Sequence, residues 1–269
     1  MSLLQQGRDC GPSDEILTPV RMERKGKETT AAVIGAMECE IALIAERLED
    51  RSEEKAGPFR FVTGRIGRTR VVLVRSGVGK VNAAICASVT AMKYSPDFII
   101  NTGCMGGLDP GLSVLDTVAA TGTVEYDLDY GSLGDERGTV FLPDGRSVMI
   151  AKTDEKLTAG LIAAAEACGR RVVTGVVASG DRFVDDPAAK AFIRDSFGAC
   201  GCEMEGASIG HACLALGIPF AVLRSVSDGA DGSAGMSFAE FSEAASALSA
   251  EIVCGFLAGV RRKGGRKHE

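Results

Sequence analysis

The chain of 269 residues has no tryptophan and only two histidines, His211 and His268. Aromatic residues make up 5% of the sequence, so a large core must be built mainly from Ala, Val, Ile and Leu, which suits a sheet covered by helices. With so few histidines, a histidine-based triad or metal site is poorly supported. We therefore expect no metal and no organic cofactor, and chemistry that depends mainly on carboxylates.

The sequence also lacks excess positive charge, a long apolar run and a disulfide pattern. Its net charge is -6 at pH 7, which argues against a nucleic-acid partner because phosphate backbones bind clustered positive charge. No apolar run reaches membrane-spanning length and the N-terminus has no apolar signal core, so no membrane association and a cytoplasmic location are expected. The nine cysteines are scattered through apolar segments and are expected to be reduced.

From residue 31 onwards, short β-branched runs alternate with amphipathic stretches, joined by short linkers. This alternation predicts an α/β fold, with a single domain over 31–262 and a mixed, largely parallel central sheet flanked by helices. Residues 1–30 are polar and charged, so a flexible N-terminal extension is expected there. Residues 263–269 are expected to form a basic C-terminal tail.

The expected elements follow from hydrophobic periodicity and from turn residues. Strands are expected near 31–36, 59–67, 69–77, 97–103, 114–121, 171–181 and 219–228, helices near 38–49, 80–93, 155–168, 187–196, 205–216 and 238–262, and a loop near 126–146. Polar clusters follow several of these strands, and α/β sheets bind ligands beyond the carboxyl ends of their strands. Neither SGVGK nor NTGCMGG matches a nucleotide-binding motif, although the glycines of NTGCMGG would let a ligand approach the backbone.

Seven short motifs stand out by their order and spacing. They are AMECE (36–40), SGVGKVNAA (76–84), DFIINTGCMGG (97–107), SGDRF (179–183), CEMEGASIGHAC (202–213), RSVSDGAD (224–231) and SFAEF (237–241). Together they resemble the 5'-methylthioadenosine/S-adenosylhomocysteine nucleosidases of the nucleoside phosphorylase superfamily, over residues 31–258. The resemblance implies a nucleoside phosphorylase-like fold, a small-molecule nucleoside substrate, hydrolysis of an N-glycosidic bond that releases adenine, and a homodimer whose partner helps to cover the 5' pocket.

Cleavage of a ribosyl–purine bond passes through a transition state that resembles an oxocarbenium ion. By resemblance, Asp228 lies beside the purine N7 and 6-amino group, and partial burial is expected to raise its pKa so that it can donate a proton. Glu205 is expected to accept hydrogen bonds from the ribose 2' and 3' hydroxyls and to stabilise the cationic sugar. Without the other motifs, Asp228 would equally fit a turn or helix cap, and Glu205 a helix N-terminus.

Glu40 distinguishes hydrolysis from phosphorolysis. Enzymes that use phosphate need cationic groups around a dianion, whereas AMECE offers two glutamates and no cation. The resemblance gives Glu40 the role of general base toward water. The alternative, an exposed glutamate on the first turn of a helix, fits Glu38 better.

Further residues are expected to bind the substrate or to support the catalytic carboxylates. By resemblance, Met37 lies near the 5' side, Met204 packs against the sugar, Glu203 supports the site, and Val184 offers backbone groups to the adenine edge. Phe183 and Phe238 fit base-stacking and 5'-pocket positions, although aromatic core packing would also explain them. Arg224 could anchor Glu205, and Ser227 could orient Asp228.

One motif departs from the family pattern. The family commonly has Thr-Gly-Ser-Ala-Gly-Gly where this chain has Cys104 and Met105 before Gly106. A hydroxyl is lost and a bulky thioether is gained beside the expected ribose and purine site, so the 5' preference could differ. A phosphorylase, a futalosine-type hydrolase and a non-catalytic nucleoside-binding protein remain as alternative functions.

Overall fold

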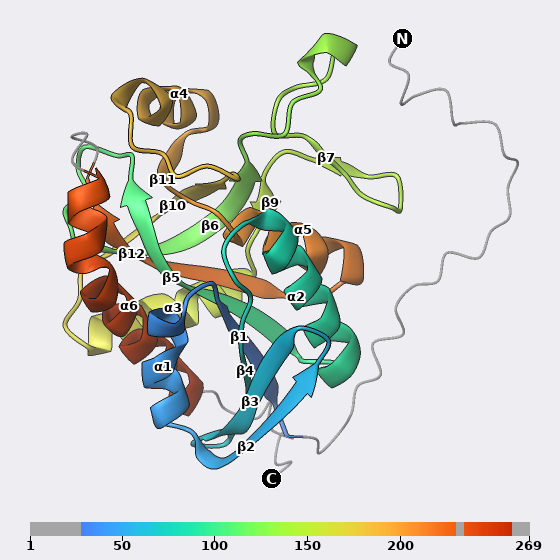
Figure 1. The fold of residues 1–269 in the computed structure, drawn as a ribbon, viewed down its shortest axis with the longest axis vertical. Helices are drawn as coiled ribbons and strands as arrows, with labels where there is room; N and C mark the ends of the chain where they lie inside the picture. The colour runs from blue at the N-terminus through green and yellow to red at the C-terminus, as the bar shows by residue number, and fades with distance from the viewer. Residues whose placement is uncertain (1–27, 230–233, 260–269) are drawn as a thin grey trace, which may run out of the picture.

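The computed structural model describes residues 28–229 and 234–259. Except for its last three residues, the extension expected at 1–30 lies outside the described residues, and so does the whole of the basic tail expected at 263–269. The described residues form an α/β domain in which helices cover both faces of a central sheet (Figure 1).

The large sheet has ten strands in the order β11-β10-β6-β12-β5-β1-β4-β3-β2, with β9 paired to β6. Its strands are β1 (Thr30–Gly35), β2 (Glu49–Ala56), β3 (Phe59–Ile66), β4 (Thr69–Arg75), β5 (Phe98–Gly107), β6 (Thr117–Glu125), β9 (Ala151–Lys152), β10 (Val172–Ser179), β11 (Ala199–Glu203) and β12 (Phe220–Asp228). The helices are α1 (Glu38–Glu46), α2 (Lys80–Tyr94), α3 (Glu155–Ala167), α4 (Pro187–Phe197), α5 (Gly206–Leu216) and α6 (Ala234–Gly259). Between β6 and β9 lie the short helix η2 (Gly131–Leu133) and a hairpin of β7 (Val140–Phe141) and β8 (Ser147–Val148).

The sheet is mixed, and part of it closes on itself. Strand β11 pairs in parallel with β10 and antiparallel with β5, so β5, β12, β6, β10 and β11 form a ring. In the closing contact Gly201 lies opposite Gly107, and Cys202 lies opposite Gly106. This closure brings the carboxyl ends of β5, β11 and β12 together.

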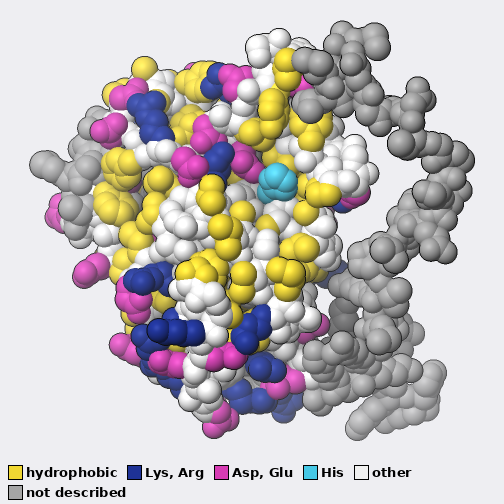
Figure 2. Space-filling view, turned by 45° about the vertical axis from the view of Figure 1, so that its right-hand side comes forward, with side chains coloured by type: hydrophobic (Ala, Val, Ile, Leu, Met, Phe, Trp, Pro, Cys, Tyr) yellow, Lys and Arg dark blue, Asp and Glu magenta, His cyan; other side chains and the backbone are white. Residues whose placement is uncertain are grey.

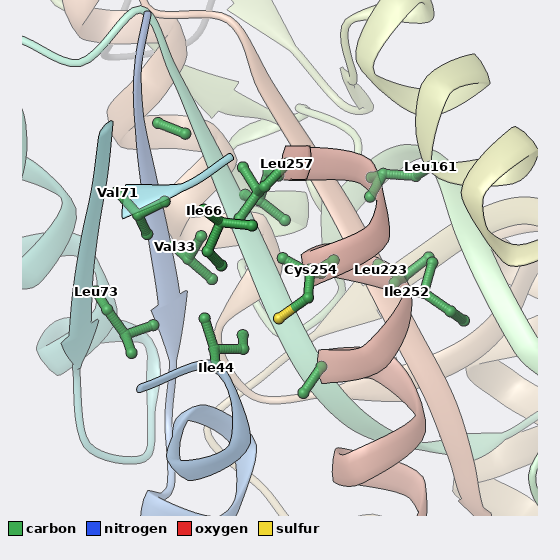
Figure 3. Packing of buried hydrophobic residues seen from close by; sticks show 14 of the residues in the cluster. Val33, Ile44, Ile66, Val71, Leu73, Leu161, Leu223, Ile252, Cys254 and Leu257 are labelled. Atoms are coloured by element: carbon green, nitrogen blue, oxygen red, sulfur yellow. The ribbon is translucent and has the colours of Figure 1, made fainter. Parts of the chain in front are cut away.

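The core lies on both sides of the sheet because successive strand residues point to opposite faces. On β1, Ala31 and Val33 pack with side chains of α1, α3 and α6, whereas Ala32 and Ile34 pack with those of α2 and α5. Figure 3 shows the first of these clusters, with Ile44 of α1 on one side and the α6 residues on the other. Burial on both faces explains why β1 reads as a continuous apolar run.

The last helix, α6, is long and apolar enough within Glu240–Gly259 to cross a membrane. Half of this window is buried inside the fold, where α6 packs on β12, β5 and α1. Core packing therefore accounts for its composition.

Several predicted element boundaries were wrong, and two of these differences change the extent of the sheet. The helix expected to reach residue 49 ends at Glu46, and the segment EDRSEEKA that follows forms the edge strand β2. Its side chains are almost all exposed, and charged edge strands resist pairing with other chains. The strand expected to end at residue 103 continues as β5 to Gly107, because β12 and β11 pair with its glycine-rich end.

Candidate active site

All of the site residues predicted from the sequence line one cavity of about 290 Å³ at the carboxyl ends of β1, β5, β11 and β12. This volume is close to the lower end of the range for small-molecule pockets, about 300–1,000 Å³. The sequence did not predict four further lining residues, which are Ala36, Val78, Arg182 and Cys202.

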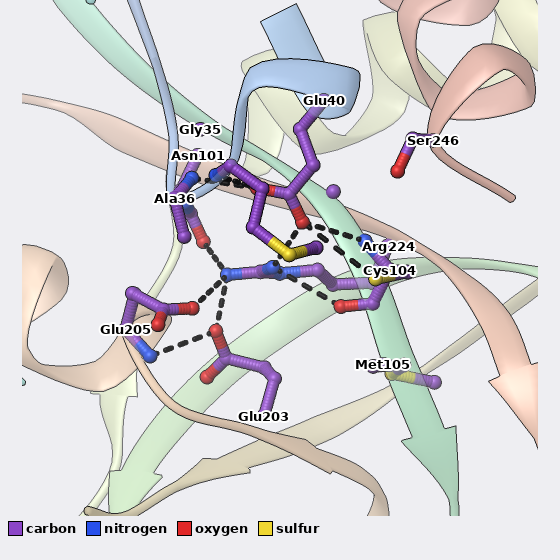
Figure 4. Close-up of polar contacts among 12 residues, drawn as sticks. Gly35, Ala36, Glu40, Asn101, Cys104, Met105, Glu203, Glu205, Arg224 and Ser246 are labelled. Carbon is purple, nitrogen blue, oxygen red and sulfur yellow. Dashed lines mark hydrogen bonds and ion pairs between the residues drawn. The ribbon is translucent and has the colours of Figure 1, made fainter. Parts of the chain in front are cut away.

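Arg224 lies at the centre of the polar contacts, with 1% of its surface exposed. Figure 4 shows its guanidinium group between three carboxylates that come from distant parts of the chain. It forms a close ion pair with Glu203 and lies 3.6 Å from Glu205 Oε2 and 3.8 Å from Glu40 Oε1. It also donates to the Asn101 side chain at 2.5 Å. The expected anchoring of Glu205 thus extends to two further glutamates.

Glu40 is held by the N-terminus of its own helix. Its Oε2 accepts hydrogen bonds from the backbone N–H groups of Ala36 at 2.6 Å and Met37 at 2.9 Å, as the N3 glutamate of a capping box does. Its Oε1 accepts from the Cys104 N–H at 3.2 Å. The side chain is buried, whereas Glu38 in the same turn is exposed. Helix capping therefore fixes one oxygen of Glu40 and turns the other toward the cavity.

Gly103 makes room for this arrangement. Its φ of +152° falls in a region that side chains disfavour, and a Cβ there would lie 2.1 Å from Glu40 Oε1 and 2.8 Å from an Arg224 nitrogen. The glycine of NTGCMGG therefore allows a carboxylate and a guanidinium group to approach the backbone of β5. In the sequence, the same glycine could have been part of an ordinary turn.

Glu203 caps helix α5, which leaves Glu205 free to face the cavity. The Glu203 carboxylate accepts from the N–H groups of Glu205 at 3.0 Å and Gly206 at 2.9 Å, and from the Ser179 hydroxyl. Glu205 stands at the N-cap position, but its side chain makes no capping bond. The helix-terminus role considered for Glu205 thus belongs to Glu203, which also contributes to the cavity wall.

Glu205 is positioned instead from the start of α2. Its Oε1 accepts from the Gly79 N–H at 2.9 Å. The next residue, Lys80, forms ion pairs with Glu125 at 3.1 Å and Asp127 at 2.5 Å, which fix this end of α2. These contacts connect residues far apart in the sequence, and the motifs alone did not predict them.

The pH dependence of stability should report on Glu205. Burial, with the nearby Glu203 charge, raises the pKa of Glu205 to about 8. A raised pKa means that the folded protein holds this proton more tightly than the unfolded chain, so the stability it contributes is lost as pH rises from about 4.5 to about 8. We expect Glu205→Gln to gain stability relative to the wild type across this window in urea unfolding. If the free energies of unfolding of the two proteins change in parallel with pH, the raised pKa assigned to Glu205 is wrong.

Asp228 lies at the opposite side of the cavity, with both carboxylate oxygens bonded. Ser227 donates to its Oδ1 at 3.0 Å, as the sequence suggested. Lys190 of α4 donates to its Oδ2 at 3.3 Å, which the sequence analysis missed. Burial disfavours the charged form of Asp228 and the ammonium group favours it, so the expected effect of burial does not act alone. The available signal was a lysine in register with Ile193 and Phe197 on the buried face of α4.

The apolar part of the cavity contains the two predicted phenylalanines. Phe183 and Phe238 pack edge to face with ring centroids 5.6 Å apart, although the first follows β10 and the second lies on α6. Met37 and Val78 line the cavity beside Glu40, and Val78 also lines a neighbouring hollow on the surface. An apolar wall therefore stands next to the carboxylates, which suits a ligand with one polar and one apolar end.

Cys104 and Met105, which replace the serine and alanine common in the family, both fit within the fold. Burial and the neighbouring Glu40 raise the pKa of the Cys104 thiol, so the thiol stays neutral and lies 3.7 Å from Glu40 Oε1. Met105 is buried and extends over Gly201, where a Cβ would lie 2.4 Å from its Sδ and Cε atoms. The small residue on β11 thus provides the space that the large residue on β5 needs.

This pairing predicts the effect of Gly201→Ala. The added Cβ displaces Met105 toward the cavity, and overpacking of this kind destabilises proteins by about 1–3 kcal/mol. We expect lower stability in urea unfolding and a weaker affinity for nucleoside ligands. The double variant Gly201→Ala with Met105→Ala should recover most of the ligand affinity, so the two substitutions should be strongly non-additive. Simple additivity would show that the two side chains are not coupled.

Comparison with known proteins agrees with this fold. A family model described as "Phosphorylase superfamily" matches residues 30–258, which places the chain in that superfamily. The 5'-methylthioadenosine/S-adenosylhomocysteine nucleosidase of Actinobacillus succinogenes is 41% identical over 227 residues, covering 84% of this chain and 97% of that protein. The chain belongs to this nucleosidase family.

Solved structures of relatives show the same fold. The nucleosidase from Neisseria meningitidis, in complex with methylthio-immucillin-A, is 38% identical with a TM-score of 0.82, covering 86% of this chain and 100% of that one. The futalosine hydrolase of Helicobacter pylori is 30% identical with a TM-score of 0.81, covering 87% of this chain and 99% of that one. The fold is thus shared by enzymes whose names give different nucleosides.

Proposed function

We propose that the protein hydrolyses the N-glycosidic bond of 5'-methylthioadenosine, S-adenosylhomocysteine or a related 5'-modified adenosine, and releases adenine. The observation that carries this proposal is the convergence of Glu40, Glu205 and Asp228 on one cavity that also has an apolar wall. The names of the relatives support the substrate class.

The charges around Glu40 favour water over phosphate as the nucleophile. Two arginines are among the described residues that line the cavity. Arg224 faces three carboxylates, and Arg182 pairs with Asp186. Among the described lining residues, a phosphate dianion beside Glu40 would therefore meet a carboxylate and no uncommitted cation, whereas a water molecule could donate a proton to Glu40.

The proposed reaction divides the work between the two ends of the cavity. Glu40 removes a proton from a water molecule while the oxygen of that water attacks the anomeric carbon. Glu205 accepts hydrogen bonds from the ribose hydroxyls. When it is ionised, which becomes more frequent as the pH approaches its pKa of about 8, its carboxylate stabilises the positive charge that develops on the sugar. At the other end, Asp228 passes a proton to the purine as the bond to it breaks. Phe183, Phe238 and Met37 enclose the base and the 5' substituent, Met204 packs against the sugar and Val184 binds the adenine edge.

The same proposal includes a homodimer. Hydrophobic side chains gather over the middle of the face formed by α2 and α5, as Figure 2 shows. Val81, Ile85 and Met92 of α2 are all at least 48% exposed, and Val78 connects this surface to the cavity. An exposed apolar surface of this kind is typical of a protein interface. A second copy placed there would cover the 5' end of the cavity.

Charged substitutions on α2 test the dimer. We expect Val81→Lys combined with Ile85→Lys to give a monomer in sedimentation analysis and to raise KM for methylthioadenosine, because the 5' end of the cavity is uncovered. Lys substitution at exposed Phe192 of α4 serves as the control, with no change expected in assembly. A doubly substituted protein that stays dimeric would place the interface elsewhere.

We further propose a cytoplasmic location and a role in methionine salvage. All eight cysteines among the described residues are free, which fits a reducing compartment. Methylthioadenosine carries the thiomethyl group that such a route would recover.

The proposed activity is tested by measuring adenine release from methylthioadenosine, S-adenosylhomocysteine, adenosine and a futalosine-type nucleoside, each with and without phosphate. We expect release from the first two without phosphate. Strict dependence on phosphate would indicate a phosphorylase, and preference for the futalosine-type substrate would indicate the activity named for the Helicobacter pylori relative. Tight binding without turnover would indicate a nucleoside-binding protein.

A further inference from the structure

Lys190 is a buried cation that the proposed reaction has not yet used. It lies on α4, faces the interior together with Ile193 and Phe197, and is 2% exposed. Its ammonium group donates to Asp228 Oδ2 at 3.3 Å and to the carbonyl oxygen of Gly229. It does not line the cavity itself but lies behind Asp228. Lysine is almost never buried to this degree without a specific partner.

A second titratable group, the thiol of Cys202, lies near Lys190 and Asp228. The thiol of Cys202 on β11 is affected by the charges of both Asp228 and Lys190, and burial raises its pKa to about 12. It is therefore neutral and does not compete for the charge of the ammonium group. The ion pair between Lys190 and Asp228 thus places a buried cation directly beside the carboxylate at this end of the cavity.

The ion pair has a consequence for proton donation. Asp228 accepts hydrogen bonds on both oxygens, from Ser227 and from Lys190, and the adjacent ammonium group favours its ionised form. An ionised carboxylate has no proton of its own to give. The purine still requires one, because the electron pair of the breaking bond moves onto the base.

We propose that Lys190 is a positioning residue that supplies this proton through Asp228. This inference rests on the proposed function. As the bond between the anomeric carbon and the purine nitrogen breaks, its electron pair enters the purine ring, the Lys190 ammonium group passes a proton to Asp228, and Asp228 passes a proton to N7. Asp228 is then a carboxylate again, and Lys190 is left as a neutral amine. Solvent protonates this amine again after adenine leaves.

Rates measured with two substrates that have different leaving groups distinguish proton supply by Lys190 from a purely structural role. Methylthioadenosine needs protonation of its base, whereas the 4-nitrophenyl glycoside of 5-methylthioribose releases a stable anion that needs no proton. For Lys190→Met we expect adenine release to fall at least about 100-fold, as for loss of a general acid. Release of nitrophenolate should fall less than about tenfold. Lys156→Met, on the exposed face of α3, is the control and should change neither rate.

The outcomes distinguish the possible roles. Equal losses on both substrates would show that Lys190 only maintains the fold of the site, and no loss on either would show that it is dispensable; each result would overturn the proposal. Lys190→Arg keeps the charge but holds its proton too tightly to release it, so recovery of adenine release in this variant would also overturn it. Failure of the wild-type protein to release adenine would instead reject the proposed function itself.

Discussion

Glu40→Gln is expected to reduce adenine release about 10²–10⁴-fold, the range for loss of a general base. The amide oxygen of glutamine can still accept from the Ala36 and Met37 N–H groups that hold Glu40, so the start of α1 should remain folded. The amide cannot take a proton from water. Steady-state assays with methylthioadenosine should show the loss in kcat with little change in KM.

Glu38→Gln provides the matched control for this substitution. Glu38 is in the same helical turn and its side chain is 71% exposed, with a single ion pair to Arg75 at 3.5 Å. We expect wild-type turnover for this variant. A Glu40→Gln enzyme that also keeps wild-type turnover would show that another group activates the nucleophile.

Arg224→Met is expected to have the largest effect on stability. The substitution removes the cation that faces Glu40, Glu203 and Glu205 and leaves their carboxylates buried without it. Removal of one partner from a buried ion pair destabilises proteins by about 3–5 kcal/mol. Urea unfolding should show a loss of this size. Part of it should be regained at acidic pH, where the carboxylates can take up protons.

Arg224→Lys separates charge from geometry. Lysine keeps the positive charge but cannot reproduce the planar donor group that bonds Asn101 and Glu203 together. We expect a stability between those of the wild type and Arg224→Met. If Arg224→Met were as stable as the wild type, Arg224 would not be the residue that holds the carboxylates together.

The residues that line the cavity could be predicted from the sequence, whereas most of the contacts that hold them in place could not. Glu40, Glu205 and Asp228 could be predicted to lie close together because each stands at or just after the carboxyl end of a strand, within a motif whose neighbours fit the same family. The fold class was predictable for the same reason, since alternating β and α patterns leave few arrangements of a sheet covered by helices. Both predictions depend on local patterns that short stretches of sequence contain.

The missed features depend on tertiary contacts. Strand β2 is charged throughout and has no apolar alternation, so only its pairing with β3 reveals it. The continuation of β5 to Gly107 depends on β11 and β12, which come about 100 residues later. Lys190 looked like an ordinary helix residue until Asp228 was placed opposite it. The register of Lys190 with Ile193 and Phe197 was a local sign of its burial, but no short window of sequence indicates which residues any of these features contact.

A crystal structure with methylthio-immucillin-A, the ligand bound in the Neisseria meningitidis relative, tests the central claim most directly. The account predicts Glu205 oxygens within about 3 Å of the sugar hydroxyls, Asp228 at a similar distance from the base, and a water molecule held by Glu40 beneath the anomeric position. A bound analogue that leaves any of the three carboxylates out of reach of its expected atom would contradict the account.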